Sequence, residues 1–169
     1  MKKWVLNKLN NANYYAQQMI TPTLKVRGFG LTKIPLIFIV GPKVLQLDHQ
    51  ECKIKIPLNR ITRNHANCMY FGALAIGADL ACGLLAMHAF QNSSFHFLFK
   101  DVKGEFLKRC ESDAIFHCAD GDKIHEAVEQ AIVKNERINI PLSINVYAPE
   151  TLGEEKCAEF IMTLSIKAK

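Results

Sequence analysis

The segment that covers residues 63–90 constrains the fold more than any other part of the chain. After a polar start it becomes almost wholly apolar from residue 69 onward, and its many Ala, Leu and Met residues favour a helix. A single acidic residue, Asp79, interrupts the apolar run near its middle. Because the apolar residues do not gather on one stripe, we expect this helix to be buried on all sides.

A run of this length is long enough to cross a bilayer, which needs about 20 apolar residues. Three observations argue against a membrane span. Asp79 would lie near the bilayer centre at a cost of roughly 2.5–3.5 kcal/mol. The chain has no second candidate segment, and the remaining sequence alternates as a soluble sheet does. We therefore expect a core helix and no membrane span.

One face of the predicted helix carries the acid among small side chains. Gly72, Ala75, Asp79, Cys82 and Ala86 follow one another at spacings of three and four, which places them on the same face. Such a face allows close approach by a neighbouring backbone or by a substrate. The helix offers the carboxyl no charged neighbour, so it must find hydrogen bonds or its pKa rises. Perturbed acids are frequent at functional sites, although structural networks also produce them.

The composition is that of one globular domain, which we place at residues 1–169. Of the 169 residues 49% are hydrophobic, which is enough for a substantial core. The formal charge is +5, but the Lys and Arg residues are scattered among acids rather than clustered. A nucleic-acid partner is therefore disfavoured, and a small molecule that bears phosphate suits the charge equally well.

The six cysteines do not resemble a metal site. They form no CxxC pair, and His65 with Cys68 lacks a second pair at ligand spacing, so we expect no metal. Buried free thiols in a reducing cytoplasm explain them best. The basic start of the chain loses its apolar run after three residues, so it does not predict a signal peptide. We expect a cytoplasmic protein.

The other segments alternate as strands or repeat as amphipathic helices. We expect an N-terminal amphipathic helix in residues 1–22 that ends at Pro22 and packs on the domain, with docking on a membrane surface as the less favoured alternative. The further elements expected are an apolar wall segment at residues 31–42, a strand at 43–58, two strands about a turn at 95–109, a strand at 114–118, a helix at 123–134, and strands at 137–147 and 156–167.

Five or six mostly antiparallel strands and one long apolar helix predict an α+β fold. A helix that is apolar all round needs a sheet curved about it, which is the architecture of the hotdog fold. So short a sheet leaves an edge strand and part of the helix open. A symmetric homodimer would cover both, and a dimer of dimers is a second possibility.

Three features of the central segment resemble a known family: Asn64, the sequence Tyr70-Phe71-Gly72, and Asp79. The chain resembles the hotdog-fold thioesterases of the PaaI-like group, and more closely the domain of unknown function 4442, which is related to the YiiD-type C-terminal thioesterase domain. In PaaI-like enzymes a loop Asn precedes a His-Gly-Gly helix start by six residues and the catalytic acid by fifteen. Asn64 stands at the same spacings here, but Tyr70-Phe71-Gly72 replaces the His-Gly-Gly.

The resemblance covers most of the chain and implies a thioesterase acting on an acyl-CoA or acyl-carrier-protein substrate. Coenzyme A would enter as part of the substrate, and no cofactor is implied. Asp79 would act as general base or nucleophile, and Asn64 would orient water or substrate across a dimer interface. The first helical turn has unpaired N–H groups and the positive end of the dipole, so the amides of Phe71 and Gly72 are natural donors to the thioester carbonyl.

His65 and Tyr70 are the expected substrate-binding residues, and His65 is a candidate replacement for the missing family histidine. Structural roles stay open: Asn64 as a cap or loop brace, His65 as a hydrogen-bonded loop residue, Tyr70 and Phe71 as core or acyl-pocket lining. A non-catalytic acyl-binding or CoA-binding protein is the main alternative function. A hydratase is disfavoured because no Asp-x-Asn-x-x-His segment is present. Scattered basic residues are available for CoA phosphates: Lys100, Lys103, Lys108 and Arg109.

Overall fold

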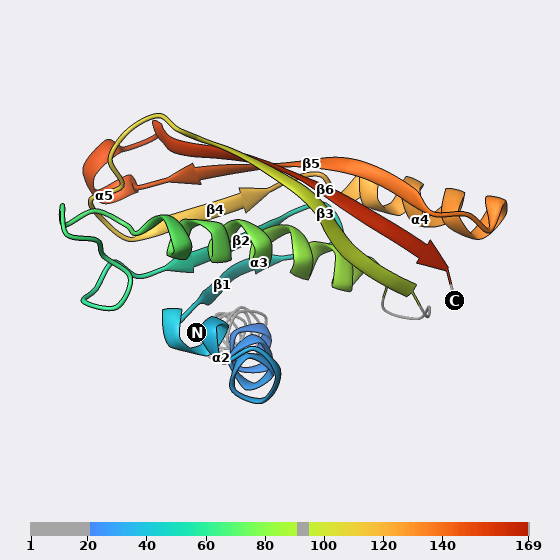
Figure 1. Cartoon of the computed structure of the whole chain (residues 1–169), viewed down its shortest axis with the longest axis horizontal. Helices are drawn as coiled ribbons and strands as arrows, with labels where there is room; N and C mark the ends of the chain where they lie inside the picture. Colours follow the sequence, from blue (N-terminus) through green and yellow to red (C-terminus); the bar gives the residue numbers. More distant parts are fainter. Residues whose placement is uncertain (1–20, 91–94, 169) are drawn as a thin grey trace, which may run out of the picture.

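A six-stranded antiparallel sheet curves around one long helix, α3 (Phe71–Ala89), in the computed structural model, which describes residues 21–90 and 95–168 (Figure 1). The strands are β1 (Lys43–Leu47), β2 (Cys52–Ile56), β3 (Phe95–Phe106), β4 (Ala114–Cys118), β5 (Ile138–Tyr147) and β6 (Lys156–Ala168). They lie in the order β1-β2-β4-β5-β6-β3, so β1 and β3 are the two edges. The shorter helices are α2 (Pro35–Val40), α4 (Gly121–Lys134) and α5 (Pro149–Leu152).

The predicted architecture of a sheet wrapped around a central helix is confirmed. Small residues on one side of α3 let the sheet approach closely: Ala78, Ala81 and Ala86 are fully buried. At Gly77 the ring of Phe116 from β4 lies where a side chain would stand, because an added Cβ would be 2.3 Å from that ring. By length and composition alone α3 is apolar enough to cross a membrane. Its packing under β2 and β4 accounts for the same apolar sequence.

The prediction that α3 is buried on all sides is wrong for the single chain. Phe71 at its start and Met87 near its end are 58% and 48% exposed, and Gly72, Ala75 and Asp79 are half-buried. The sheet covers only part of the helix circumference, so one side of α3 stays open. This agrees with the expectation that so short a sheet leaves part of the helix open.

The alternating strands supply the other wall of the core. Inward-facing residues of β2, β4, β5 and β6 are almost completely shielded from solvent: Ile54, Phe116, Ile144, Phe160 and Leu164. The predicted strands at residues 114–118, 137–147 and 156–167 and the helix at 123–134 are confirmed. All six cysteines are free thiols, and every one except the half-buried Cys68 is buried.

Two strand predictions were wrong in detail. The expected strand at residues 43–58 is a hairpin of β1 and β2, because the carboxylate of Asp48 accepts the backbone N–H groups of Gln50 and Glu51 and stabilises a turn. The two strands expected about a turn near Gly104 are one strand, β3, with a register shift between Phe99 and Val102.

The N-terminal helix predicted for residues 1–22 lies almost entirely outside the described residues. Residues 21–33 are helical, so the prediction that Pro22 ends a helix is wrong. The apolar segment that follows does lead into β1, but it first forms α2. Pro35 stands in the first turn of α2, where its missing N–H has no helical partner to lose. Gly41 then ends the helix with a left-handed φ of 63°.

Candidate functional site

The first turn of α3 is held in place from both sides but has no side-chain cap. The backbone N–H of Met69 donates to the carbonyl of Cys110 at 2.8 Å, and that of Tyr70 donates to the carbonyl of Thr62 at 2.8 Å. Within the described part of the chain, the next two amides, those of Phe71 and Gly72, have no acceptor. Two N–H donors at the positive end of the helix dipole are therefore free to bind an anion or a carbonyl oxygen.

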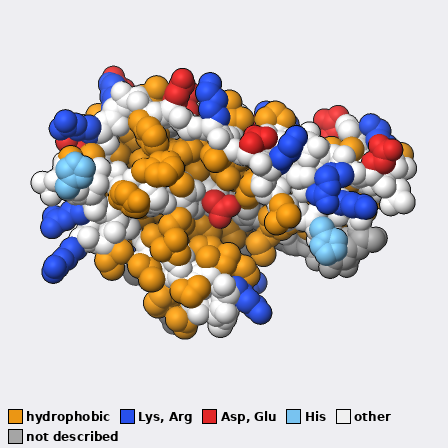
Figure 2. All heavy atoms as spheres, in the orientation of Figure 1, with side chains coloured by type: hydrophobic (Ala, Val, Ile, Leu, Met, Phe, Trp, Pro, Cys, Tyr) orange, Lys and Arg blue, Asp and Glu red, His pale blue; other side chains and the backbone are white. Residues whose placement is uncertain are grey.

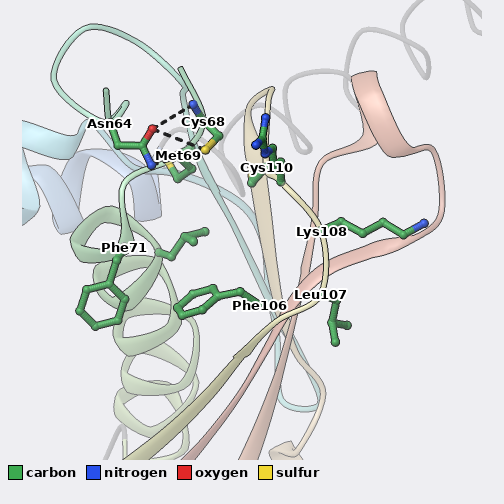
Figure 3. Close-up of a pocket in the computed structure, with 10 residues that line it drawn as sticks. Asn64, Cys68, Met69, Phe71, Phe106, Leu107, Lys108 and Cys110 are labelled. Carbon is green, nitrogen blue, oxygen red and sulfur yellow. Dashed lines mark hydrogen bonds between the residues drawn. The ribbon is translucent and has the colours of Figure 1, made fainter. Parts of the chain in front are cut away.

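A pocket of about 470 Å³ opens beside this turn, between the loop before α3 and the end of β3 (Figure 3). Its floor is apolar: the rings of Phe71 and Phe106 meet edge to face with centroids 5.9 Å apart. The lining residues are Asn64, Cys68, Met69, Phe71, Leu74, Phe106, Leu107, Lys108, Arg109 and Cys110. The size and apolar floor suit a chain-like or flat hydrophobic group.

Asn64 braces the loop that forms one wall of the pocket. Its side-chain oxygen accepts the backbone N–H groups of Ala66 and Cys68 at 2.9 and 3.2 Å, and its Nδ2 donates to the Cys68 thiol at 3.4 Å. Figure 3 shows the Asn64 oxygen in contact with both the backbone nitrogen and the sulfur of Cys68. The bracing role allowed for this residue is therefore present. The amide oxygen is already engaged, so only the remaining N–H of Nδ2 is available to a ligand.

Asp79 stands on the open side of α3 without a polar partner. Among the described residues no hydrogen bond or ion pair reaches its carboxylate, and burial raises its pKa above the usual value. Asp79 is the only acid in α3. A half-buried carboxyl of this kind is a stronger base than an ordinary surface carboxylate.

The single chain does not bring the predicted site residues into one cavity. Asn64 and Phe71 line the pocket, whereas His65, Tyr70 and Asp79 do not. Helix geometry puts Asp79 on the same face as Gly72 but about 10 Å further along the axis. The Tyr70 ring lies over the first turn: a Cβ added at Gly72 would be 2.5 Å from that ring, so a side chain there would displace it.

Several pocket residues were not predicted as site residues. Cys68, Met69, Phe106 and Cys110 carry no motif, and the β3 residues reach the start of α3 only through the pairing of β3 with β6. Lys108 and Arg109, two of the four basic residues considered for phosphate binding, also line the pocket. Lys108 forms an ion pair with Glu155, while Arg109 has no ion pair within the described residues.

Comparison with known protein families identifies the family of this chain. The model of the domain of unknown function DUF4442 matches residues 26–157. The chain belongs to the DUF4442 family. No functionally curated protein matches this DUF4442 sequence.

Solved structures share its hotdog fold. Protein PA5026 of Pseudomonas aeruginosa, described as a protein of unknown function and "probable thioesterase", is 21% identical, with 88% of this chain and 97% of that chain covered at a TM-score of 0.75. Thioesterase superfamily member 2 of zebrafish is 10% identical, with 88% and 97% covered at a TM-score of 0.65. OLEI01261 of Chlorobaculum tepidum, of unknown function, is 15% identical, with 91% and 99% covered at a TM-score of 0.73. At these identities the likeness shows the fold, and it confirms the predicted hotdog architecture.

Proposed function

We propose that this DUF4442 protein is a thioesterase that hydrolyses an acyl-CoA or acyl-carrier-protein thioester. The observation that carries the proposal is the unpartnered, half-buried carboxyl of Asp79 on the open side of α3, with its raised pKa. The free amides of Phe71 and Gly72 on the same helix supply the second requirement, donors for an oxyanion. The hotdog fold shared with proteins named thioesterases supports this reading.

In the proposed reaction Asp79 acts as general base or nucleophile. As a base, its carboxylate takes a proton from water while the water oxygen bonds to the thioester carbonyl carbon. The amides of Phe71 and Gly72 bind the resulting oxyanion, and its collapse breaks the C–S bond. The leaving thiolate then recovers the proton from the Asp79 carboxyl. No metal or further cofactor takes part, and we place the protein in the cytoplasm.

A second copy of the chain would complete the site. Phe71 and Asp79 each lie four residues from Ala75, in opposite directions along α3. If two α3 helices cross antiparallel on a two-fold axis near Ala75, Asp79 of one copy comes opposite Phe71 of the other. The small side chain of Ala75 allows such a close approach.

The free edge of the sheet supports this homodimer, which a dimer of dimers would also contain. Edge strand β3 runs for 12 residues, and its Leu98 and Val102 are 72% and 59% exposed. A long edge of this kind is a liability unless another chain pairs with it. We expect Ala75→Cys to cross-link two copies under mild oxidation, whereas Met87→Cys, roughly 18 Å further along the helix, does not. Wild-type protein oxidised in parallel controls for the natural thiols.

The remaining predicted residues take supporting roles in this proposal. Asn64 fixes the pocket loop and offers one N–H to water or substrate. Arg109 meets a CoA phosphate at the pocket rim. His65 and Tyr70 are proposed as substrate contacts outside the pocket floor.

A panel of acyl-CoA substrates with increasing chain length, followed by release of free thiol, tests the proposal. Wild-type protein should hydrolyse at least one substrate, and Asp79→Asn should lose about 10²-fold or more in kcat/KM. Met87→Ser, a change on the same helix outside the proposed site, is the matched control and should retain activity. Equal turnover by the wild type and Asp79→Asn would remove Asp79 from the reaction.

A non-catalytic acyl-binding or CoA-binding protein is the second candidate. Its specific support is the helix start, where Tyr70-Phe71-Gly72 stands in place of the His-Gly-Gly of PaaI-like enzymes. Such a protein would bind an acyl-CoA in calorimetry and hydrolyse none of the panel, which separates the two candidates.

A further inference from the structure

Two N-terminal helices expose bulky apolar side chains to solvent. Residues 21–33 belong to the first of these helices, and α2 is the second. Figure 2 shows hydrophobic groups gathered over this region. We call these exposed side chains the N-terminal apolar surface; they are 43–63% exposed and comprise Leu24, Phe29, Leu31, Ile34, Leu36, Phe38 and Ile39. The surface of a soluble protein rarely exposes this many apolar side chains in so short a segment.

Poor packing of the two helices is not the reason why these side chains are exposed. The opposite side of the pair is docked on the domain through buried Val26, Ile37 and Val40. Arg27 donates hydrogen bonds to the carbonyls of Gly41 and Pro42, which ties the first helix to the end of the second. The two helices therefore hold the N-terminal apolar surface in a fixed orientation, away from the core.

The segment that carries this surface is basic in sequence. The first 47 residues of the chain contain seven Lys and Arg residues and no Asp or Glu, whereas the remaining residues contain fourteen basic and sixteen acidic side chains. Lys25 and Lys33 are exposed within the described part of this segment, and no ion pair joins them to an acid there. Four of these seven basic residues, Lys25, Arg27, Lys33 and Lys43, lie in the described part of the segment, which contains no acid.

We propose that the N-terminal apolar surface docks the protein on an anionic lipid bilayer. Exposed Phe, Leu and Ile side chains enter the boundary between headgroups and acyl chains, while lysines beside them meet lipid phosphates. A nucleic acid would neutralise the positive charge but would leave the aliphatic side chains in water. A second copy of this chain would cover the apolar groups but would bring the same positive charge against itself. Of these three occupants an anionic bilayer is the one that satisfies both features, and the inference does not depend on the proposed thioesterase activity.

Flotation of the full chain with vesicles tests the proposal. Vesicles of phosphatidylcholine with about one third phosphatidylglycerol should bind the wild type, and vesicles of phosphatidylcholine alone should bind it at least ~10-fold less. Binding should weaken from 0.1 to 0.5 M salt because the lipid charge is screened. We expect Lys25→Glu/Lys33→Glu and Leu36→Ser/Phe38→Ser each to reduce the partition coefficient by about 10-fold or more.

The control uses equally exposed apolar residues elsewhere on the molecule. Ile132 and Val133 on α4 are 56% and 84% exposed, and Ile132→Ser/Val133→Ser should bind vesicles as the wild type does. Absence of wild-type binding to the anionic vesicles overturns the proposal without any variant. The proposal is also overturned if Leu36→Ser/Phe38→Ser changes the molar mass of the protein in light scattering but leaves vesicle binding intact. In that case the N-terminal apolar surface joins copies of the chain.

Discussion

The two sides of α3 differ in what their small residues do. On the side toward the sheet, Gly77 and Ala78 are small because the ring of Phe116 and the neighbouring strands fill the space. On the open side, the Tyr70 ring explains the small size of Gly72, whereas Ala75 is half-buried and lies on the same face as the half-buried Asp79. Packing within the chain explains the small residues of the covered side and Gly72, and we expect a ligand or a second copy to approach Ala75 and Asp79.

This difference separates fold from function within one helix. Substitutions on the covered side should change stability first and activity only as a consequence. Substitutions on the open side should change activity and leave the fold intact. The following predictions rank from the largest expected effect on stability to the smallest.

Gly77→Leu should be the most damaging change. An added Cβ alone would stand 2.3 Å from the Phe116 ring, so the larger side chain forces β4 away from α3. We expect a loss of about 3 kcal/mol of unfolding free energy, the upper end of the usual range for overpacking, measured by urea denaturation. Gly83→Ala is the matched control in the same helix, because its Cβ would meet Phe99 at 3.8 Å, an ordinary contact. It should gain about 0.5–1 kcal/mol through helix propensity, and a similar loss in both variants would contradict the packing argument.

Asn64→Ala should have an intermediate effect. It removes the acceptor for the amides of Ala66 and Cys68, which should lower stability by about 1 kcal/mol and Tm by roughly 2–4 °C, measured by thermal denaturation. Asn64→Asp keeps the acceptor and should retain Tm. If Asn64→Asp also retains full thioesterase activity, the residue only braces its loop and does not orient water or substrate.

The pH dependence of stability should show the smallest effect, and its sign follows from Asp79. Burial raises the folded-state pKa of this carboxyl above its ordinary value of 3.8, so the folded state binds its proton more tightly than the unfolded state. The contribution of this carboxyl to folding stability is favourable below pH 3.8 and is lost as pH rises through the folded-state pKa. Asp79→Asn should therefore have a higher Tm than the wild type at pH 7, and the difference should shrink as pH falls toward 3.8. A difference independent of pH would show that burial does not perturb this carboxyl.

Most of the fold was predictable because the residues that build it repeat with a clear period. The alternation in β5 and β6 and the apolar run of α3 identified these elements from sequence. The predictions failed at Pro and Gly residues, because these residue types occur both at breaks and inside helices or strands. Pro22 and Pro35 were treated as breaks, although both lie in helices. Gly104 is typical of a turn, but it lies within β3. A glycine stands there because the Phe160 ring fills the place of a side chain, 2.8 Å from an added Cβ.

The candidate site was less accessible to sequence reasoning. Asn64, Phe71 and Asp79 were found through their spacing, but the pocket between them and β3 depends on a long-range pairing with β6. Phe106 and Cys110 have no local pattern that marks them as pocket residues. An open part of α3 was expected from the small number of strands, but the exposure of Phe71 and Met87 was not, because covered and uncovered apolar residues look alike in a sequence.

The most direct test of the central claim is to measure kcat/KM and Tm together for Asp79→Asn at pH 7, with the best substrate of the acyl-CoA panel. If the open side of α3 carries the chemistry and the covered side carries the fold, kcat/KM falls about 10²-fold or more while Tm stays level or rises. If kcat/KM is unchanged, or if Tm falls as it would for a residue of the covered side, the division of α3 into a structural and a functional side is wrong.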